Sequence, residues 1–192
     1  PVPISGMEVH TVLHGASFTF DKGEQNKKIM DLVTGLKEES KVKTKEKAPR
    51  ILITGCPMGG VADKIIPIIE ENEAVVVCYE NCSGIKEKIR LVDETKDPID
   101  ALAEKYLNIG CSVMAPNDNR VELLSELIDE YKADAVIDVI LQACHTYNVE
   151  TRRIKDFVTM EKDIPYMSIE TDYSETDKGQ LQTRIVAFIE ML

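Results

Sequence analysis

The residues of this chain that are best suited to chemistry are its five cysteines. They are Cys56, Cys78, Cys82, Cys111 and Cys144. Thiolate sulfur is a soft donor that binds zinc and iron–sulfur clusters. An odd number of cysteines, with no secretory signal to read, argues against a framework of disulfides. We therefore expect a reducing, cytoplasmic setting in which the thiols bind metal, do redox chemistry or lie inert in the core.

The spacing of the cysteines leaves more than one use open. Zinc sites built from four cysteines show paired C-x-x-C knuckles, and this chain has none. Single cysteines on separate loops suit a cluster that is held in a cleft between elements. Buried or idle thiols are the other alternative, because cysteine is among the most buried residue types.

Cys144 and His145 follow an apolar, β-branched run over residues 135–141. A buried strand that ends on a thiol and an imidazole presents both at the edge of a parallel sheet, where ligands bind in such folds. His145 can hydrogen-bond a thiolate or a substrate there. We read the next residues as a short polar turn and expect a new helix to begin near Asn148.

The elements that must position these side chains alternate along the chain. We expect strands at 50–54, 74–79, 135–141 and 165–170, and helices at 61–72, 97–107, 119–132, 148–162 and 177–192. Pro67 should kink the first of these helices or mark a second start, and Asn119 should cap the third. This alternation predicts a three-layer α/β domain with a four-stranded parallel sheet, flavodoxin-like or Rossmann-like, in the order 2-1-3-4.

Residues 1–48 read as an N-terminal helical extension and linker, and residues 49–192 as the α/β domain. Within the extension we expect the end of a helix at 4–13, a loop at 15–22, a helix at 24–40 and a linker at 41–49. The only basic run, 37–47, has glutamates between its lysines and should face solvent. His10 and His14 are assigned no role.

The predicted strand ends bring three thiols to one rim of the sheet. The first strand ends at Cys56, the second at Cys82 and the third at Cys144. Cys111 lies in an irregular connection that can fold back over the same rim. Cys78 belongs to the body of a strand.

Two further groups lie near this rim. Gly59 and Gly60, between a strand and a helix, are either a weak anion cradle or a tight turn that lets helix and strand pack. Glu80, Glu150 and Glu170 are each expected to be a cap or a solvated acid, since glutamate is mostly exposed.

The bulk properties exclude several classes of function. The formal net charge of −11 argues against a nucleic-acid partner. No apolar run approaches the length of a membrane span, and no signal peptide opens the chain. Because the chain begins with Pro1, we expect a processed chain or a fragment of a longer one.

Four segments together resemble one known family. They are Thr54-Gly-Cys-Pro-Met-Gly-Gly60, Glu80-Asn-Cys-Ser-Gly84, Gln142-Ala-Cys-His-Thr-Tyr-Asn-Val-Glu150 and Ile169-Glu-Thr-Asp-Tyr-Ser174. They look like the C-terminal half of the 2-hydroxyacyl-CoA dehydratase D-component family, which is 2-hydroxyglutaryl-CoA dehydratase-like. The resemblance covers residues 51–192. The combination of Cys82, Cys111 and Cys144 most resembles the double-cubane cluster branch of that family.

The resemblance implies an iron–sulfur cluster, either 4Fe-4S or double-cubane, with Cys82, Cys111 and Cys144 as its ligands. An ATP-dependent activase, itself an iron–sulfur protein, would supply a low-potential electron. The reaction would be dehydration of a 2-hydroxyacyl-CoA, a lyase activity, or ATP-coupled reduction of a small molecule. His145, Tyr147 and Glu80 would stand beside the ligands and tune the cluster potential. Cys56 is not counted as a ligand, and Cys78 is expected in the core.

Members of this family are about twice as long, so the resemblance also implies partners. We expect the chain to be a C-terminal fragment that works with its own N-terminal half or a paralogous subunit, and to be a dimer at full length. Alone, the fragment is expected to be inactive and to lack an intact cluster. The alternative function is that of a metal-free α/β binding or scaffold domain that pairs with another subunit.

Overall fold

The computed structural model describes residues 2–39 and 47–192. Four parallel strands form one sheet in the order β2-β1-β3-β4. They are β1 (Arg50–Gly55), β2 (Val75–Glu80), β3 (Ala135–Leu141) and β4 (Tyr166–Thr171). The predicted α/β class and strand order are therefore confirmed. All four strands lie within one or two residues of their predicted positions, and β3 has the predicted bounds.

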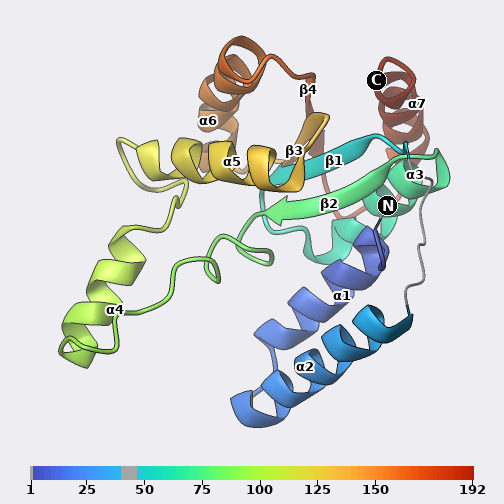
Figure 1. Cartoon of the computed structure of the whole chain (residues 1–192). Coiled ribbons are helices and arrows are strands. Elements are labelled where there is room, and N and C mark those ends of the chain that lie inside the picture. The colour runs from blue at the N-terminus through green and yellow to red at the C-terminus, as the bar shows by residue number, and fades with distance from the viewer. Residues whose placement is uncertain (1, 40–46) are drawn as a thin grey trace.

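Helices cover both faces of the sheet, which gives the predicted three layers (Figure 1). On one face, α3 (Ala62–Glu71) and α7 (Lys178–Ile189) pack against Ile51 and Ile53 of β1. On the other, α5 (Asp118–Tyr131) and α6 (His145–Asp156) pack near Leu52. Successive residues of a strand point to opposite faces, so β1 alone contributes to both cores. Apolar burial on both faces is what the near-continuous apolar strands require.

The helix starts differ from the predictions at several places. A short 3₁₀ turn, η1 (Gly59–Val61), precedes α3, and Pro67 lies inside an unbroken α3, so it marks no second start. Asn119 is not a cap, because α5 begins at Asp118 after Asn117. The most consequential difference is α6, which begins at His145 and not near Asn148. It ends in a π-helical turn, η2 (Phe157–Glu161).

The N-terminal helix α1 (Gly6–Ser17) docks on the sheet domain. The Gly6 N–H donates to Glu70 Oε1 at 2.6 Å, and the Tyr79 hydroxyl donates to the Gly6 carbonyl at 2.8 Å. A Cβ at position 6 would lie 2.6 Å from the Val76 Cβ, so glycine is what permits this approach. α1 extends to Ser17, into the segment expected to be a loop. The division of the chain at residue 48 stays a prediction.

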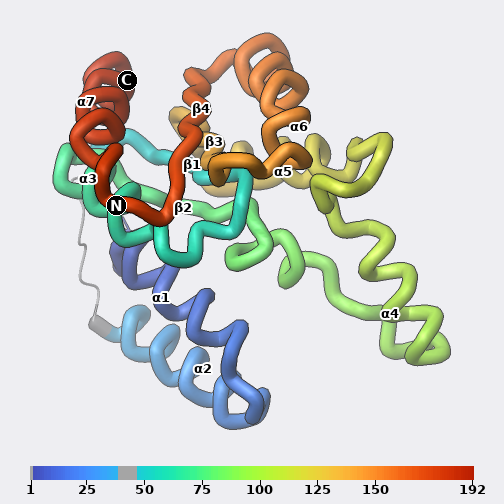
Figure 2. The backbone as a smooth tube through the Cα atoms, turned by 180° about the vertical axis from the view of Figure 1, so that it is seen from behind, coloured from blue at the N-terminus to red at the C-terminus, as the bar shows by residue number. Residues whose placement is uncertain are grey.

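Two helices lie away from the sheet. α2 (Lys22–Glu39) runs beside α1, and α4 (Pro98–Leu107) projects from the body in both views (Figures 1 and 2). Most of the linker expected at 41–49, and most of the basic run at 37–47, lies outside the described residues. None of the helices in the described parts of the chain is long and apolar enough to cross a membrane.

Candidate functional site

A row of buried polar side chains crosses the carboxyl half of the sheet. The strand register places Thr54 of β1 beside both Glu80 of β2 and Asp138 of β3. All three are at most 1% exposed. The Thr54 hydroxyl donates to Glu80 Oε2. This row lies at the end of the sheet where ligands bind in open parallel folds. Two of its members, Glu80 and Asp138, are acids, and acidic side chains are rarely found buried.

Arg120 of α5 supplies the positive charge that this row requires. Its guanidinium donates to Thr54 Oγ1 at 3.0 Å and lies 3.6 Å from Glu80 Oε2 and 3.9 Å from Asp138 Oδ1. It also donates to Glu150 Oε2 of α6 at 2.5 Å. Burial opposes the charge on Arg120, but the carboxylates around it hold its pKa above the ordinary value. One side chain therefore ties together β1, β2, β3, α5 and α6.

Lys86 and Tyr147 extend this charged cluster toward the rim. The fully buried Lys86 Nζ lies 3.0 Å from Glu80 Oε1 and donates to the Tyr147 hydroxyl at 3.2 Å. The Tyr147 ring lies between two cations, 5.2 Å from Lys86 Nζ and 5.0 Å from the Arg120 guanidinium carbon. Cations over an aromatic face are attracted by its quadrupole. Tyr147 is thus fixed at both its ring and its hydroxyl. We refer to Thr54, Glu80, Lys86, Arg120, Asp138, Tyr147 and Glu150 as the charged cluster.

Asp138 is the carboxyl group of the charged cluster that is least suited to ionise. Burial raises its pKa, although Arg120 and the hydrogen bond from the Tyr166 hydroxyl, 2.7 Å from Oδ2, act in the opposite direction. Its Oδ1 is buried without a hydrogen-bond partner among the described residues.

Two of the predicted ligand thiols lie at the edge of the charged cluster. Cys82 is half-buried, and its Sγ lies 3.8 Å from the Tyr147 hydroxyl. Cys144 is half-buried at the residue before α6. Partial burial opposes a thiolate there, but the backbone at the start of α6 and the side chains of Thr146 and Cys56 act in the opposite direction and hold the Cys144 pKa below its ordinary value. Such a thiolate is suited to bind metal.

The third predicted thiol, Cys111, approaches from the connection between α4 and α5. It is half-buried and follows Gly110, where a Cβ would lie 2.6 Å from the Arg120 Cα. The next residues, 112–117, and the start of α6 line a shallow pocket of about 590 Å³. His145 lines the same pocket and is exposed. The loop that follows Cys111 therefore lies beside the start of α6, the helix that Cys144 precedes.

The remaining cysteines are buried. Cys78 is in the core, as expected, and burial raises its pKa to about 12. Cys56 is 1% exposed, and burial likewise raises its pKa to about 12. It accepts the Leu141 N–H at 3.4 Å and packs in one small group with Cys144, an arrangement that the sequence did not suggest.

The other predicted site residues divide between buried and exposed positions. Glu80 is fully buried, so the expectation of a cap or solvated acid is wrong for it, and Glu150 is mostly buried by its ion pair with Arg120. Glu170 is exposed. Gly59 and Gly60 lie at the turn before α3, where Gly60 faces the Tyr173 ring and not the charged cluster.

The sulfur atoms at this site are donors of the type that binds an iron–sulfur cluster. Their arrangement fits such a cluster only partly. Two half-buried thiols, Cys82 and Cys144, lie beside Tyr147 of the charged cluster, and the half-buried Cys111 lies on the connection before α5. Within residues 2–39 and 47–192, no three His, Cys, Asp or Glu side chains come close enough to hold a metal ion by themselves. The thiols therefore fit one wall of a shared site. Their role as ligands stays a prediction.

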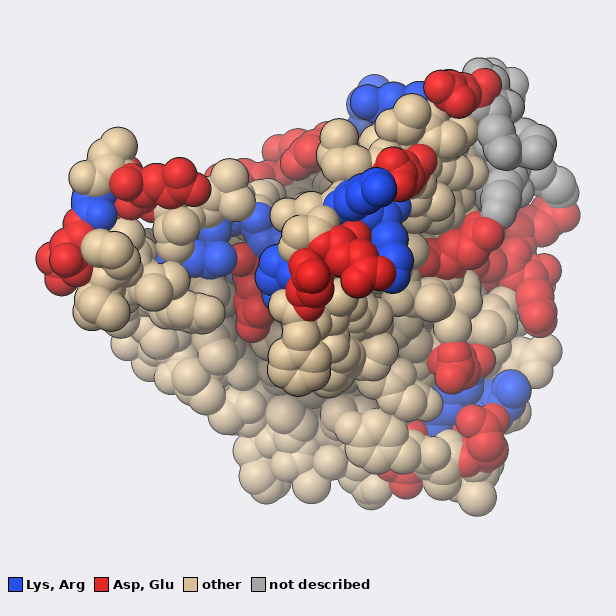
Figure 3. Space-filling view, turned by 90° about the horizontal axis from the view of Figure 1, so that it is seen from below, with Lys and Arg blue, Asp and Glu red and all other residues tan. Residues whose placement is uncertain are grey.

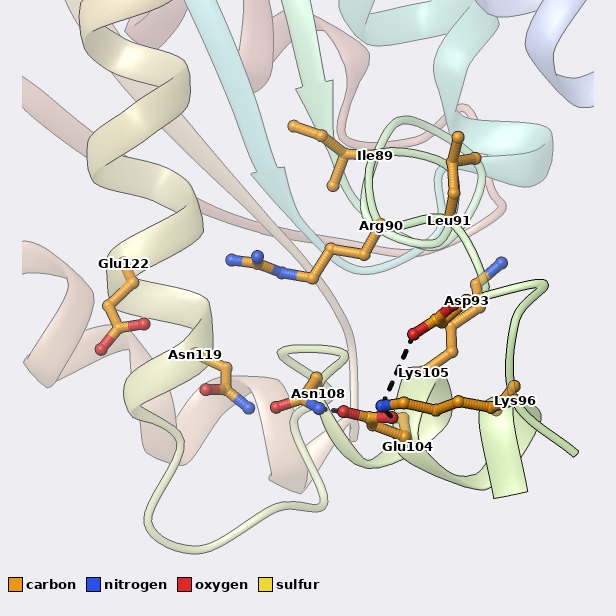
Figure 4. A pocket seen from close by; sticks show the side chains of 11 residues that line it. Ile89, Arg90, Leu91, Asp93, Lys96, Glu104, Lys105, Asn108, Asn119 and Glu122 are labelled. Atoms are coloured by element: carbon orange, nitrogen blue, oxygen red, sulfur yellow. Dashed lines mark hydrogen bonds and ion pairs between the residues drawn. The ribbon is translucent and has the colours of Figure 1, made fainter. Parts of the chain in front are cut away.

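A second pocket, of about 490 Å³, has a different character. It lies between the segment before α4, α4 itself and the start of α5 (Figure 4). Inside this pocket, Lys96 Nζ forms ion pairs with Glu104 Oε2 at 2.5 Å and with Asp93 Oδ2 at 3.7 Å. On the face shown in Figure 3, basic and acidic side chains likewise stand beside one another. None of the cysteines lines this pocket, so it is not part of the thiol site.

Comparison with known proteins assigns the chain to a family. The family model described as 2-hydroxyglutaryl-CoA dehydratase, D-component, matches residues 1–192. The chain belongs to this dehydratase D-component family. The resemblance seen in the four sequence segments is thereby confirmed, and the match includes the N-terminal 50 residues that the resemblance left out. Membership of the double-cubane branch stays a prediction.

Two curated relatives of this dehydratase-family chain are subunits. The protein named "Putative dehydratase subunit YjiM" from Escherichia coli (strain K12) is 50% identical over 193 residues, which cover 100% of this chain and 50% of the relative. The (R)-phenyllactyl-CoA dehydratase beta subunit of Clostridium sporogenes is 29% identical over 181 residues, covering 92% of this chain and 46% of the relative. The chain thus spans about half the length of both.

Proposed function

We propose that this chain holds part of an iron–sulfur cluster in a dehydratase that acts on a 2-hydroxyacyl-CoA. The observation that carries the proposal is the partly exposed Cys144 thiol at the residue before α6, where its sulfur lies 3.6 Å from the Thr146 hydroxyl oxygen. A family member of known name, the phenyllactyl-CoA dehydratase beta subunit, supports the substrate class. Reduction of a small molecule is the related reaction that the double-cubane resemblance favours.

Cys82, Cys111 and Cys144 would hold the cluster. When bound, it would supply one low-potential electron to the substrate. The protein's own part is to fix the sulfurs. Tyr147, held by Lys86, directs its hydroxyl at Cys82, and the Thr146 hydroxyl lies 3.6 Å from the Cys144 sulfur. Hydrogen bonds to ligand sulfur raise a cluster's reduction potential.

The proposal includes partners that complete the site. An ATP-dependent activase would deliver the electron, and a second polypeptide segment would supply the other wall. That segment is either the remaining half of a longer chain or a paralogous subunit, in keeping with relatives that are named as subunits and are twice as long. We also propose a dimer at full length and a cytoplasmic, anaerobic setting that protects an open cluster from oxygen.

Anaerobic reconstitution tests the proposal. The protein at its natural full length is incubated with iron and sulfide, and its iron content and visible absorbance are measured. We expect brown protein with about four iron atoms per cubane. Cys144→Ser should lower the iron content, whereas Cys78→Ala, which removes a core thiol, should not. Colourless wild-type protein would favour the metal-free scaffold function, and full iron content in Cys144→Ser would remove Cys144 from the ligands.

A further inference from the structure

Cys56 and Cys144 are brought together by one residue of β3. The Leu141 N–H donates to the Cys56 sulfur at 3.4 Å, and the Leu141 carbonyl accepts the Cys144 N–H at 2.9 Å. The two side chains pack in one small hydrophobic group with Ile140 and Tyr147. Both cysteines are therefore held against the end of β3.

Gly55 brings the end of β1 close enough to β3 for this contact. It has φ +106°, and a Cβ there would lie 2.2 Å from the Val139 carbonyl oxygen. The next residue, Cys56, donates its N–H to that same oxygen at 2.8 Å. Cys56 is thereby held against the end of β3, and Cys144 follows that end by three residues.

We propose that Cys56 and Cys144 form a reversible disulfide in the iron-free protein, with a low-molecular-weight disulfide as the oxidant. Cys144 is half-exposed and Cys56 is 1% exposed, so the oxidant reaches Cys144 first. The Cys144 sulfur attacks one sulfur of the oxidant, forms a mixed disulfide and releases one small thiol. Cys56 then gives up its proton, attacks the Cys144 sulfur and releases the second small thiol. Two protein thiols lose two electrons, and one small disulfide becomes two thiols.

Because Cys56 is buried, the second step is the slower one. Because the two cysteines pack in the same small group, closure within the protein then competes with return of the small thiol.

The disulfide would have a consequence for the proposed function, and that consequence rests on it. Cys144 in a disulfide cannot donate a thiolate to iron. While the cluster is absent, oxidation would therefore prevent Cys144 from binding iron. A reducing thiol would restore its ability to bind. The disulfide would also shield Cys144 from irreversible oxidation to sulfinic acid.

Peptide mapping tests the disulfide without reference to iron. The iron-free protein is treated with oxidised glutathione at neutral pH, its free thiols are blocked, and its peptides are identified by mass. We expect a cross-link between the peptides of Cys56 and Cys144 that dithiothreitol reverses. Cys56→Ser should stop at a glutathione adduct on Cys144, and Cys78→Ala should close like the wild type. A lasting adduct on wild-type Cys144, or a cross-link from Cys144 to Cys82 or Cys111, would overturn the proposal.

Iron uptake then tests the consequence separately. Oxidised and reduced wild-type protein are reconstituted side by side, and lower iron content is expected for the oxidised sample. Equal iron content in both samples would show that the disulfide does not control iron binding, although the disulfide itself would remain established by the mapping. Absence of iron from both samples, with the cross-link mapped, would contradict the proposed function and leave the disulfide established.

Discussion

The positive charge of Arg120 cannot be replaced by local rearrangement of the fold. Arg120 is 0% exposed, and its partners Thr54, Glu80 and Glu150 come from three elements of the two layers that it joins. Placing a charge in the interior is costly, and the cost is offset only while every partner is present. Removing the arginine leaves buried carboxylates without a counter-charge. Its contribution to the fold therefore exceeds that of any exposed ion pair.

We expect Arg120→Met to lower the free energy of unfolding by about 3–5 kcal/mol, the usual cost of breaking a buried ion pair. The matched control is Arg152→Met, because Arg152 is exposed and pairs with Asp156 one helical turn away. That change should cost less than about 0.5 kcal/mol. Urea denaturation followed by circular dichroism measures both. Equal effects of the two substitutions would contradict the role given to Arg120.

Asp138 gives a second prediction at this scale. Because burial raises its pKa, Asp138→Asn replaces a carboxyl that already tends to be neutral. The asparagine oxygen can still accept the Tyr166 hydroxyl. The substitution should change the free energy of unfolding at pH 7 by less than about 1 kcal/mol, whereas Glu80→Gln should cost more, since it unbalances Lys86 and Arg120. A larger loss of unfolding free energy for Asp138→Asn than for Glu80→Gln, in the same urea assay, would contradict this prediction.

These residues also show what sequence alone does not reveal. Arg120, Lys86 and Asp138 were not singled out, because charged side chains are mostly exposed and nothing local marks a buried one. The signal that was present is an acid, Asp138, within an otherwise apolar strand. Such a residue needs a partner, but the partner is distant in the sequence and only the folded arrangement identifies it.

At the scale of elements, the strands were predictable and the start of α6 was not. Residues 135–141 are apolar except for Asp138, and such a run is typical of a strand covered on both faces. Cys144 is not a residue that usually precedes a helix, and the polar residues after it are typical of a turn. The Cys144 side chain makes no capping hydrogen bond, so no capping signal in the sequence marks where α6 begins.

Helix α1 carries a buried histidine that should make its docking depend on pH. His10 is 6% exposed, and its ring packs between those of His14 and Tyr79. Burial and the neighbouring His14 lower the pKa of His10, against an opposing effect of Asp63. The unfolded chain, with a histidine pKa of about 6.5, therefore binds a proton before the folded protein does.

The free energy of unfolding should accordingly fall as the pH decreases from about 6.5 to the lowered pKa of His10. In His10→Phe this part of the loss should be absent. The measurement is the free energy of unfolding in urea at pH 7.5 and pH 5.5 for both proteins. If the wild type and His10→Phe lose the same amount of stability over this interval, His10 does not link docking to pH.

At the scale of the whole molecule, α4 stands apart from the packed layers. Ile99, Leu102 and Tyr106 are 73%, 43% and 61% exposed and share one face of the helix. Only Ala101 of this helix is buried. Isolated helices of this length are marginal in water. α4 should therefore open far more often than α5, which packs into the core.

Hydrogen exchange followed by mass spectrometry measures this difference within one sample. The amides of Pro98–Leu107 should exchange at least tenfold faster than those of Asp118–Tyr131, since local opening needs little free energy where few apolar contacts are lost. Equal protection of the two helices would show that α4 is stabilised by contacts that its exposure does not reveal.

The contact between Gly110 and Arg120 couples two parts of the protein mechanically. A missing side chain lets the backbone before Cys111 rest directly on the backbone of α5. A side chain at position 110 would push the loop that carries Cys111 away from α5. The placement of this thiol relative to the Arg120 backbone therefore depends on the one residue type that has no side chain.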